Sequence, residues 1–194
     1  WGFDKRNSGL APAGVDSYMS YGSSWANMSN TPLSNYKKSL SEGGLSTPMI
    51  VSWPAGIATT SQRRISQQII HLTDIMPTLC ELSGSRYPIT FNESAILPMQ
   101  GFSFSNHLQS GKITRRAPIY WSLEQRKAVI WNNYKIIADS DHEAWELYDL
   151  STDRGEQRNL AATEPAVLND MAKMWVDWAT KLRILDNRPP NKVE

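Results

Sequence analysis

IYWSLEQRKAVIWNNYKIIADSDHEAWELY, residues 119–148, contains four short runs that are rich in aromatic and β-branched side chains. Those runs are residues 119–121, 128–131, 134–138 and 145–148. Such side chains favour β-strands. Asn132-Asn133, between the second and third runs, suits a two-residue hairpin turn because asparagine tolerates positive φ. The stretch therefore predicts a meander of four antiparallel strands.

A helix with a single apolar stripe is predicted after the meander. Its apolar residues recur at alternating spacings of three and four: Leu168, Met171, Trp175, Trp178 and Leu182. This is the period of one face of an α-helix, and the charged residues between them fall on other faces. Four strands with one apolar face need a cover, which this helix supplies. We therefore expect residues 111–194 to form an α+β subdomain that closes its own core.

Residues 1–110 show no comparable complete unit. Residues 1–35 are dense in Gly, Ser, Asn and Pro, and predict a loop. The apolar run at residues 49–53 (MIVSW) predicts a strand buried on both faces, as in an α/β sheet. Residues 74–84 predict a helix with Asp74 as its N-cap and Gly84 at its C-terminal end.

One strand cannot make a sheet, so the predicted strand and helix are expected to belong to a larger α/β domain. Their apolar side chains then lack partners within this chain. We expect open or partner-covered apolar surface around four residues: Ile50, Val51, Ile69 and Leu79.

The composition excludes several classes of protein. The 194 residues include 20 basic and 19 acidic side chains and carry a net charge of +1, so nucleic acid and anionic membrane are not expected partners. No apolar run approaches the roughly 20 residues that span a bilayer. The single cysteine excludes a disulfide within the chain. The sequence starts at Trp1 with no leader, and we expect a piece of a longer protein.

Residues suited to catalysis are few. No glycine-rich phosphate loop is present, and the three histidines (His71, His107 and His142) lack metal-ligand spacing. Lys37 lies five residues before Glu42-Gly43-Gly44, where the backbone can turn sharply. An ordinary surface ammonium is one interpretation of Lys37. The other is a compact positive charge aimed at an anionic group from a rigid turn.

A series of short motifs resembles the C-terminal portion of arylsulfatases, members of the sulfatase family in the alkaline-phosphatase-like superfamily. The motifs occur in the family's order across nearly the whole chain. They are residues 25–27 (WAN), 29–32 (SNTP), 36–37 (YK), 42–50 (EGGLSTPMI), 53–57 (WPAGI), 74–79 (DIMPTL), 145–150 (WELYDL), 153–156 (DRGE) and 159–161 (NLA).

The resemblance implies a fold and a reaction. Residues 1–110 would be the incomplete C-terminal end of an α/β sulfatase catalytic domain. Residues 111–194 would be the α+β C-terminal subdomain, a four-stranded antiparallel sheet covered by one C-terminal helix. The implied reaction is hydrolysis of a sulfate ester by a formylglycine nucleophile, with calcium and cationic side chains holding the sulfate oxygens. The implied partners are a sulfated small molecule or glycan and the rest of the sulfatase domain.

Few of the family's site residues can be transferred to this sequence. Lys37 matches the family lysine that contacts the sulfate near its leaving oxygen. Trp25 and Tyr21 are candidates for lining the substrate approach. Cys80 is followed by Glu81-Leu82 and not by the x-Pro-x-Arg of the formylglycine motif. The nucleophile and the calcium ligands are thus expected outside this chain, and the chain alone is expected to be inactive. By family analogy, the complete protein is expected in the periplasm or outside the cell.

Two other functions remain open at this point. One is hydrolysis of phosphate or phosphonate esters by a relative in the same superfamily. The other is a non-catalytic carbohydrate-binding or interaction module that uses Trp121, Trp131 and Trp145 as a stacking face. The alternative for these rings is burial under the C-terminal helix against Trp175 and Trp178, which we favour.

Overall fold

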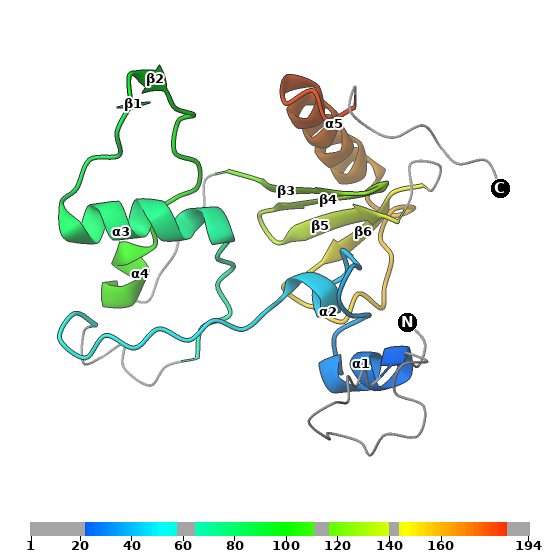
Figure 1. Ribbon diagram of the computed structural model, residues 1–194. Helices are drawn as coiled ribbons and strands as arrows, with labels where there is room; N and C mark the ends of the chain where they lie inside the picture. Colours follow the sequence, from blue (N-terminus) through cyan, green and yellow to red (C-terminus); the bar gives the residue numbers. More distant parts are fainter. Residues whose placement is uncertain (1–21, 58–64, 111–116, 140–143, 186–194) are drawn as a thin grey trace, which may run out of the picture. The chain divides into compact units, whose positions relative to one another are not determined.

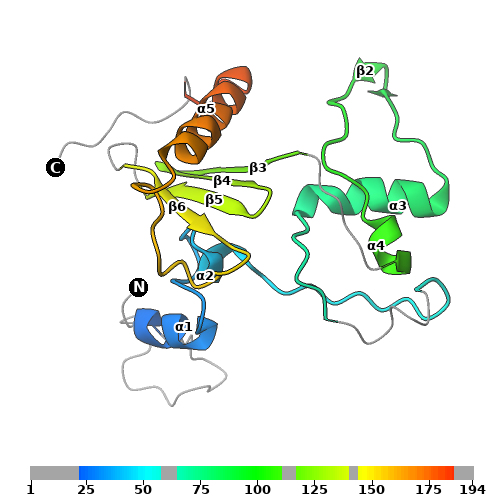
Figure 2. The ribbon, with the colours of Figure 1, turned by 180° about the vertical axis from the view of Figure 1, so that it is seen from behind.

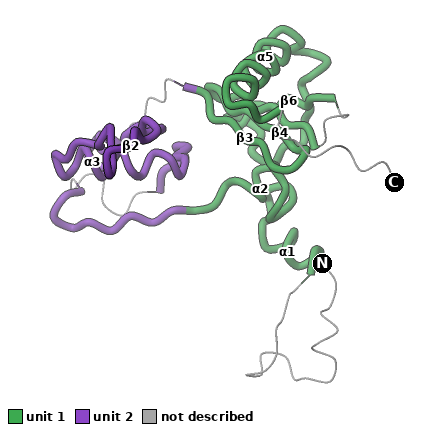
Figure 3. Tube along the Cα trace, turned by 45° about the horizontal axis from the view of Figure 1, so that its top comes forward, with its two compact units in different colours: residues 1–48, 118–194 green, residues 49–117 purple. Residues whose placement is uncertain are grey.

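The computed structural model describes residues 22–57, 65–110, 117–139 and 144–185 (Figure 1). The chain divides into two compact units, coloured separately in Figure 3. Unit 1 contains residues 1–48 and 118–194, and unit 2 contains residues 49–117. The predicted domain boundary at residue 110 stays a prediction, since it refers to a complete sulfatase domain.

Unit 1 is built on a four-stranded antiparallel sheet. Its strands are β3 (Ile119–Leu123), β4 (Arg126–Trp131), β5 (Tyr134–Ala138) and β6 (Glu146–Asp149). They pair in sequence order, β3-β4-β5-β6, which confirms the predicted meander. Asn132 has a φ of 54° in the turn between β4 and β5, so the conformation expected of that turn is present.

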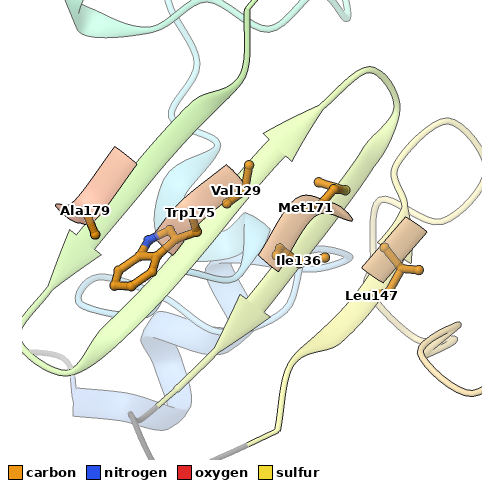
Figure 4. Packing of buried hydrophobic residues seen from close by; sticks show 6 residues of the cluster. All are labelled: Val129, Ile136, Leu147, Met171, Trp175 and Ala179. Carbon is orange, nitrogen blue, oxygen red and sulfur yellow. The ribbon is translucent and has the colours of Figure 1, made fainter. Parts of the chain in front are cut away.

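Helix α5 (Pro165–Lys181) covers one face of this sheet, as predicted. Its buried residues Met171, Trp175 and Ala179 pack on one side chain from each of three strands: Val129, Ile136 and Leu147 (Figure 4). The Trp175 indole Nε1 also donates a hydrogen bond to the Trp121 carbonyl, at 2.9 Å. Leu182 of the predicted stripe follows the helix and is 45% exposed, so the buried stripe ends about one turn earlier than its period suggested.

The opposite face of the sheet is also covered. Leu40, only 1% exposed, packs against Ala128, Ile137 and Tyr148 on that face. The short helix α2 (Glu42–Leu45) follows it, and Figures 1 and 2 show α2 and α5 on opposite sides of the sheet. The expectation that residues from 111 onward close their own core therefore missed a contribution from residues 40–45.

Unit 2 contains short elements. They are η3 (Leu72–Asp74), α3 (Ile75–Ser83), a hairpin of β1 (Thr90–Phe91) and β2 (Ser94–Ala95), and α4 (Ser105–Ser110). Helix α3 ends at Gly84, which has a φ of 68°, and this confirms the predicted helix and its C-terminal glycine. The Asp74 carboxylate accepts hydrogen bonds from the backbone N–H groups of His71 and Phe102, both at 2.8 Å, and not from α3 itself.

Two predictions about local structure were wrong. Residues 22–30 form helix α1 (Gly22–Asn30) within the stretch predicted as loop. Its last side chain, Asn30, donates hydrogen bonds to the carbonyls of Asn35 and Gly43, and these bonds hold the end of the helix. Residues 49–53 form no strand, because no neighbouring strand in the described residues pairs with them.

The expected apolar surface is present in unit 2. Ile50, Val51 and Leu79 are 93%, 40% and 55% exposed, whereas Ile69 is half-buried. Among the described helices, none is both long and apolar enough to cross a membrane.

Candidate functional site

Lys37 lies in a tightly folded segment, residues 34–46, which we call the Lys37 loop. One backbone hydrogen bond joins its two sides, from Gly43 N–H to the Ser34 carbonyl at 2.8 Å. A second, from Ser39 N–H to the Tyr36 carbonyl at 3.0 Å, closes the turn that contains Lys37. The Asn35 side chain donates to the Ser41 hydroxyl at 3.0 Å. These contacts close the segment on itself, so its shape is determined locally.

The two glycines permit this closure. A Cβ on Gly43 would overlap the carbonyl oxygens of Asn35 and Ser34, and a Cβ on Gly44 would overlap that of Ser39. Only a residue without a side chain allows backbone segments to approach this closely. The Glu42-Gly43-Gly44 motif thus makes the sharp turn that the sequence indicated.

Lys37 itself is exposed in this loop. The next residue, Lys38, has a φ of 76°, and its Nζ lies 3.7 Å from a carboxylate oxygen of Glu124. Leu40, three residues after Lys37, is anchored in the sheet face described above. The structure therefore presents the Lys37 side chain to solvent from a backbone that is anchored nearby.

A set of four titratable side chains lies at the C-terminal end of the loop; three of them are buried, and the fourth, Arg154, has a 40% exposed side chain. Lys135 Nζ is 2.9 Å from Glu42 Oε1 and 2.7 Å from Glu156 Oε1. Glu156 Oε2 accepts a hydrogen bond from the Glu42 backbone N–H at 2.8 Å. Arg154 Nη2 lies 3.4 Å from Glu42 Oε2 and donates to the Ser46 hydroxyl at 2.8 Å. We call Glu42, Lys135, Arg154 and Glu156 the Lys135 network.

Burial affects the titration of one member of the Lys135 network, Glu156. Burial raises the pKa of the Glu156 carboxyl above its usual value, because the charged form loses hydration. The neighbouring Lys135 ammonium and the hydrogen bond from Glu42 N–H act in the opposite direction. The network contains two carboxylates, one lysine and one arginine, so its charges balance when all four are ionised.

Sequence reasoning missed this network. Lys135 lies between Tyr134 and Ile136 in β5, and it shares a strand face with Ile137 because side chains alternate. The sequence did contain one indication of a buried, paired lysine, because Lys135 lies among apolar residues in a predicted strand. Glu42 and Glu156 belong to motifs used for the family resemblance, but their pairing with Lys135 depends on the tertiary fold.

The other predicted site residues have different outcomes. Trp25 lies in α1 and is 59% exposed, so its ring is accessible, while Tyr21 lies outside the described residues. Trp131 and Trp145 pack against the core cluster of α5, and Trp145 contacts the Trp175 ring edge-on at 6.0 Å. Trp121 packs instead in the cluster of Leu40. The three rings thus contribute to two packed faces of the sheet and do not form one stacking surface.

The resemblance implies calcium, which binds to a cluster of several oxygen ligands. The described residues contain no group of three or more His, Cys, Asp or Glu side chains that could hold a metal ion. The carboxylates of Glu42 and Glu156 face a lysine ammonium. They do not form a calcium ligand set, which requires several oxygen ligands around the ion.

Comparison with known proteins gives the same family over most of the chain. The family model for the C-terminal part of N-sulphoglucosamine sulphohydrolase matches residues 35–180. An uncharacterized sulfatase of Schizosaccharomyces pombe is 31% identical over 167 residues, which are 83% of this chain and 30% of that protein. The arylsulfatase of Klebsiella aerogenes is 36% identical over 104 residues, 53% of this chain and 22% of that enzyme.

An N-acetylgalactosamine-6-O-sulfatase of Bacteroides thetaiotaomicron is 28% identical over 75% of this chain and 30% of its own length. Among solved structures, a 2-O GAG sulfatase is similar, with 27% sequence identity, a TM-score of 0.39, and coverage of 56% of this chain and 24% of that one. The family assignment depends on the sequence matches, since they cover most of the chain. The chain spans less than a third of the length of these relatives.

The family match begins at residue 35 and includes Lys37, the glycine turn and all members of the Lys135 network. The sheet and all of α5 except its last residue, Lys181, lie within the same match. This chain therefore belongs to the sulfatase family, and its residues 35–180 correspond to the family's C-terminal region, homologous to that of arylsulfatases.

Proposed function

We propose that the complete protein hydrolyses sulfate esters and that Lys37 contacts the sulfate group near the leaving oxygen. The observation that carries this proposal is the presentation of Lys37. It is an exposed ammonium on a loop whose backbone is closed by two glycines and anchored by Leu40. Because the backbone that carries this charge is fixed, less reorganisation is needed to bring the ammonium to an anion, which favours electrostatic catalysis.

The chemistry requires groups beyond Lys37. Negative charge develops on the leaving oxygen as the ester bond to sulfur breaks, and a nearby ammonium lowers the energy of that state. The proposal assigns the formylglycine nucleophile and the calcium ligands to parts of the protein outside this chain. The residues that the structure describes contain no ligand set for calcium. The chain by itself is accordingly proposed to be inactive.

The proposed substrates are aryl or carbohydrate sulfates. Similar proteins include an arylsulfatase and an N-acetylgalactosamine-6-O-sulfatase, so the family contains both kinds. The exposed Trp25 ring is proposed to line the approach to the site, together with Tyr21. A periplasmic or secreted location remains part of the proposal, by family analogy.

The test is substitution of Lys37→Ala in the complete protein, with turnover of an aryl sulfate measured. Loss of the ammonium is expected to lower kcat about a hundredfold or more, the usual effect of removing one electrostatic contact to a developing charge. The matched control is Lys38→Ala, which removes an adjacent exposed lysine and is expected to change kcat less than threefold.

The same assay tests the alternative reaction, which is hydrolysis of phosphate or phosphonate esters. Wild-type protein is to be tested on an aryl sulfate and on the matching aryl phosphate. Preference for the phosphate would contradict the proposed reaction, and a near-normal rate for Lys37→Ala would remove Lys37 from the site. Calcium-dependent turnover by residues 1–194 alone would contradict the proposed inactivity of this chain.

A further inference from the structure

The Lys135 network connects three separate parts of unit 1. Glu42 comes from the Lys37 loop, Lys135 from strand β5, and Glu156 from the segment after β6. The Lys135 side chain is 0% exposed, and those of Glu42 and Glu156 are 4% and 3% exposed. Ionised groups this deeply buried are uncommon unless they are paired, as these are.

Stability alone is a weak reason for such an arrangement. Removing charged groups from water is costly, and replacing a buried ion pair by apolar residues of similar volume is often neutral or stabilising. The charged contacts also fix the orientation of the groups that they join, which apolar contacts do less well. Glu42 is held at its side chain by Lys135 and at its backbone N–H by Glu156, so both its position and its orientation are determined.

Glu42 and Lys37 belong to the same short piece of backbone, which hydrogen bonds close on itself. Gly43, the residue after Glu42, donates its N–H to the Ser34 carbonyl, and Ser39 N–H donates to the Tyr36 carbonyl. These bonds enclose Lys37 on both sides. Leu40 anchors the middle of the loop by apolar contact, and the Lys135 network holds the loop at Glu42, nearer its C-terminal end.

We propose that Lys135 is a positioning residue for Lys37: by binding Glu42 and Glu156 it sets the loop conformation in which the Lys37 ammonium meets the sulfate. This inference depends on the proposed contact between Lys37 and the substrate. Under this proposal, Lys135, Glu42 and Glu156 affect the reaction although none of them contacts the substrate.

The test is a double-mutant cycle in the complete protein. Lys135→Met together with Glu156→Gln removes one positive and one negative charge, and leaves Glu42 beside Arg154. This variant is expected to fold and to lose at least tenfold in kcat on an aryl sulfate. In the Lys37→Ala background the same change is expected to lower kcat less than twofold, because coupled residues have non-additive effects.

A merely structural role gives a different pattern. The losses would then multiply in the Lys37→Ala background, and this outcome would overturn the inference while leaving the role of Lys37 intact. A near-normal rate for Lys37→Ala alone would remove both proposals. The two failures are thus distinguishable from one set of rates.

Two further variants complete the test, one as a substitute for the double change and one as a control. Glu156→Gln alone retains the Lys135–Glu42 pair, and it replaces the double change if the double variant does not fold. It is expected to lower kcat threefold or more. In the Lys37→Ala background the same substitution is expected to leave kcat unchanged. The matched control is Lys127→Met on β4. Lys127 Nζ lies 5.0 Å from the Trp145 ring and contacts the α5 side of the sheet, so kcat is expected to stay within twofold of wild type.

Discussion

Gly43 is one of two residues at which the Lys37 loop leaves no room for a side chain. Gly43→Ala would push a Cβ into the carbonyl oxygens of Asn35 and Ser34. Because both are backbone atoms, the loop must open to accommodate the methyl group. We expect the free energy of unfolding of the chain to fall by about 1–3 kcal/mol, as for other overpacked sites, measured by urea denaturation.

Gly155→Ala is the control for this prediction. The nearest atom to its added Cβ is the Pro32 carbonyl oxygen at 3.3 Å, so a small shift suffices and a smaller loss is expected. Equal stability losses for the two variants would show that the close backbone approach at Gly43 is not the cause of the destabilisation.

Glu156 gives the fold a dependence on pH. Because burial raises the pKa of its carboxyl above 4.5 in the folded state, the folded chain binds that proton more tightly than the unfolded chain. Its contribution to the free energy of unfolding is therefore fully present below about pH 4.5 and declines as pH rises through the folded-state pKa.

The measurement compares wild type with Glu156→Gln by urea denaturation from about pH 4, near the ordinary carboxyl pKa, up to about pH 8. The stability advantage of wild type over the variant is expected to shrink as pH rises. An advantage that grows with pH would mean that Lys135 outweighs burial and lowers the pKa of Glu156.

At the residue scale, the sequence indicated Lys37 but not the Lys135 network next to its loop. The lysine and its glycine turn are adjacent in the chain, so their spacing is visible in the sequence. The partners of Glu42 lie 93 and 114 residues away, at Lys135 and Glu156. A pairing of charges over such separations depends on the strand order and register, which no local pattern contains.

At the scale of elements, helix α5 shows what a local pattern predicts well. Its apolar period follows from burial against a single sheet face, and both the period and the face are present in the structure. Residues 49–53 show the opposite case. Their apolar composition matches a buried strand, but a strand forms only with a neighbour to pair with, and the described residues supply none.

Trp175 is one of the buried residues through which α5 packs in unit 1. Its side chain is 2% exposed, and its indole donates a hydrogen bond to the Trp121 carbonyl. Trp175→Ala is expected to lower the free energy of unfolding by about 3–5 kcal/mol, since it leaves a large cavity and an unpaired carbonyl. Urea denaturation followed by near-ultraviolet circular dichroism measures the effect.

Val176 provides the matched control on the same helix. It is 47% exposed, so Val176→Ala is expected to change the free energy of unfolding by no more than about 0.5 kcal/mol. If both variants lost similar stability, the core of unit 1 would not depend on the buried face of α5.

At the scale of the whole molecule, the two units differ in how much apolar surface they bury. Nearly all buried hydrophobic side chains among the described residues belong to unit 1, whereas unit 2 contributes Phe104 and Leu108. Most exposed large hydrophobic side chains belong to unit 2, and Ile50, Ile89 and Leu97 are each more than 80% exposed. The sequence predicted this contrast from the unpartnered strand and helix of its first half.

This surface leads to a prediction about the isolated chain. Large contiguous apolar patches are rare on soluble monomers and usually mark an interface. The chain covers 30% of the length of the S. pombe sulfatase, and we expect the rest of the sulfatase domain to cover unit 2 in the complete protein. The isolated chain is therefore expected to bind the dye ANS and to self-associate, whereas the complete protein does neither.

Light scattering after size-exclusion chromatography measures the self-association. Ile50→Asp with Leu79→Asp places two charges on the exposed surface of unit 2 and is expected to shift the isolated chain toward monomer. Val176→Asp with Leu182→Asp, at exposed apolar positions on or next to α5, is the control and is expected to leave association unchanged. A monomeric wild-type chain without ANS binding would mean that unit 2 closes its own surface, because an open apolar surface of this extent favours association in water.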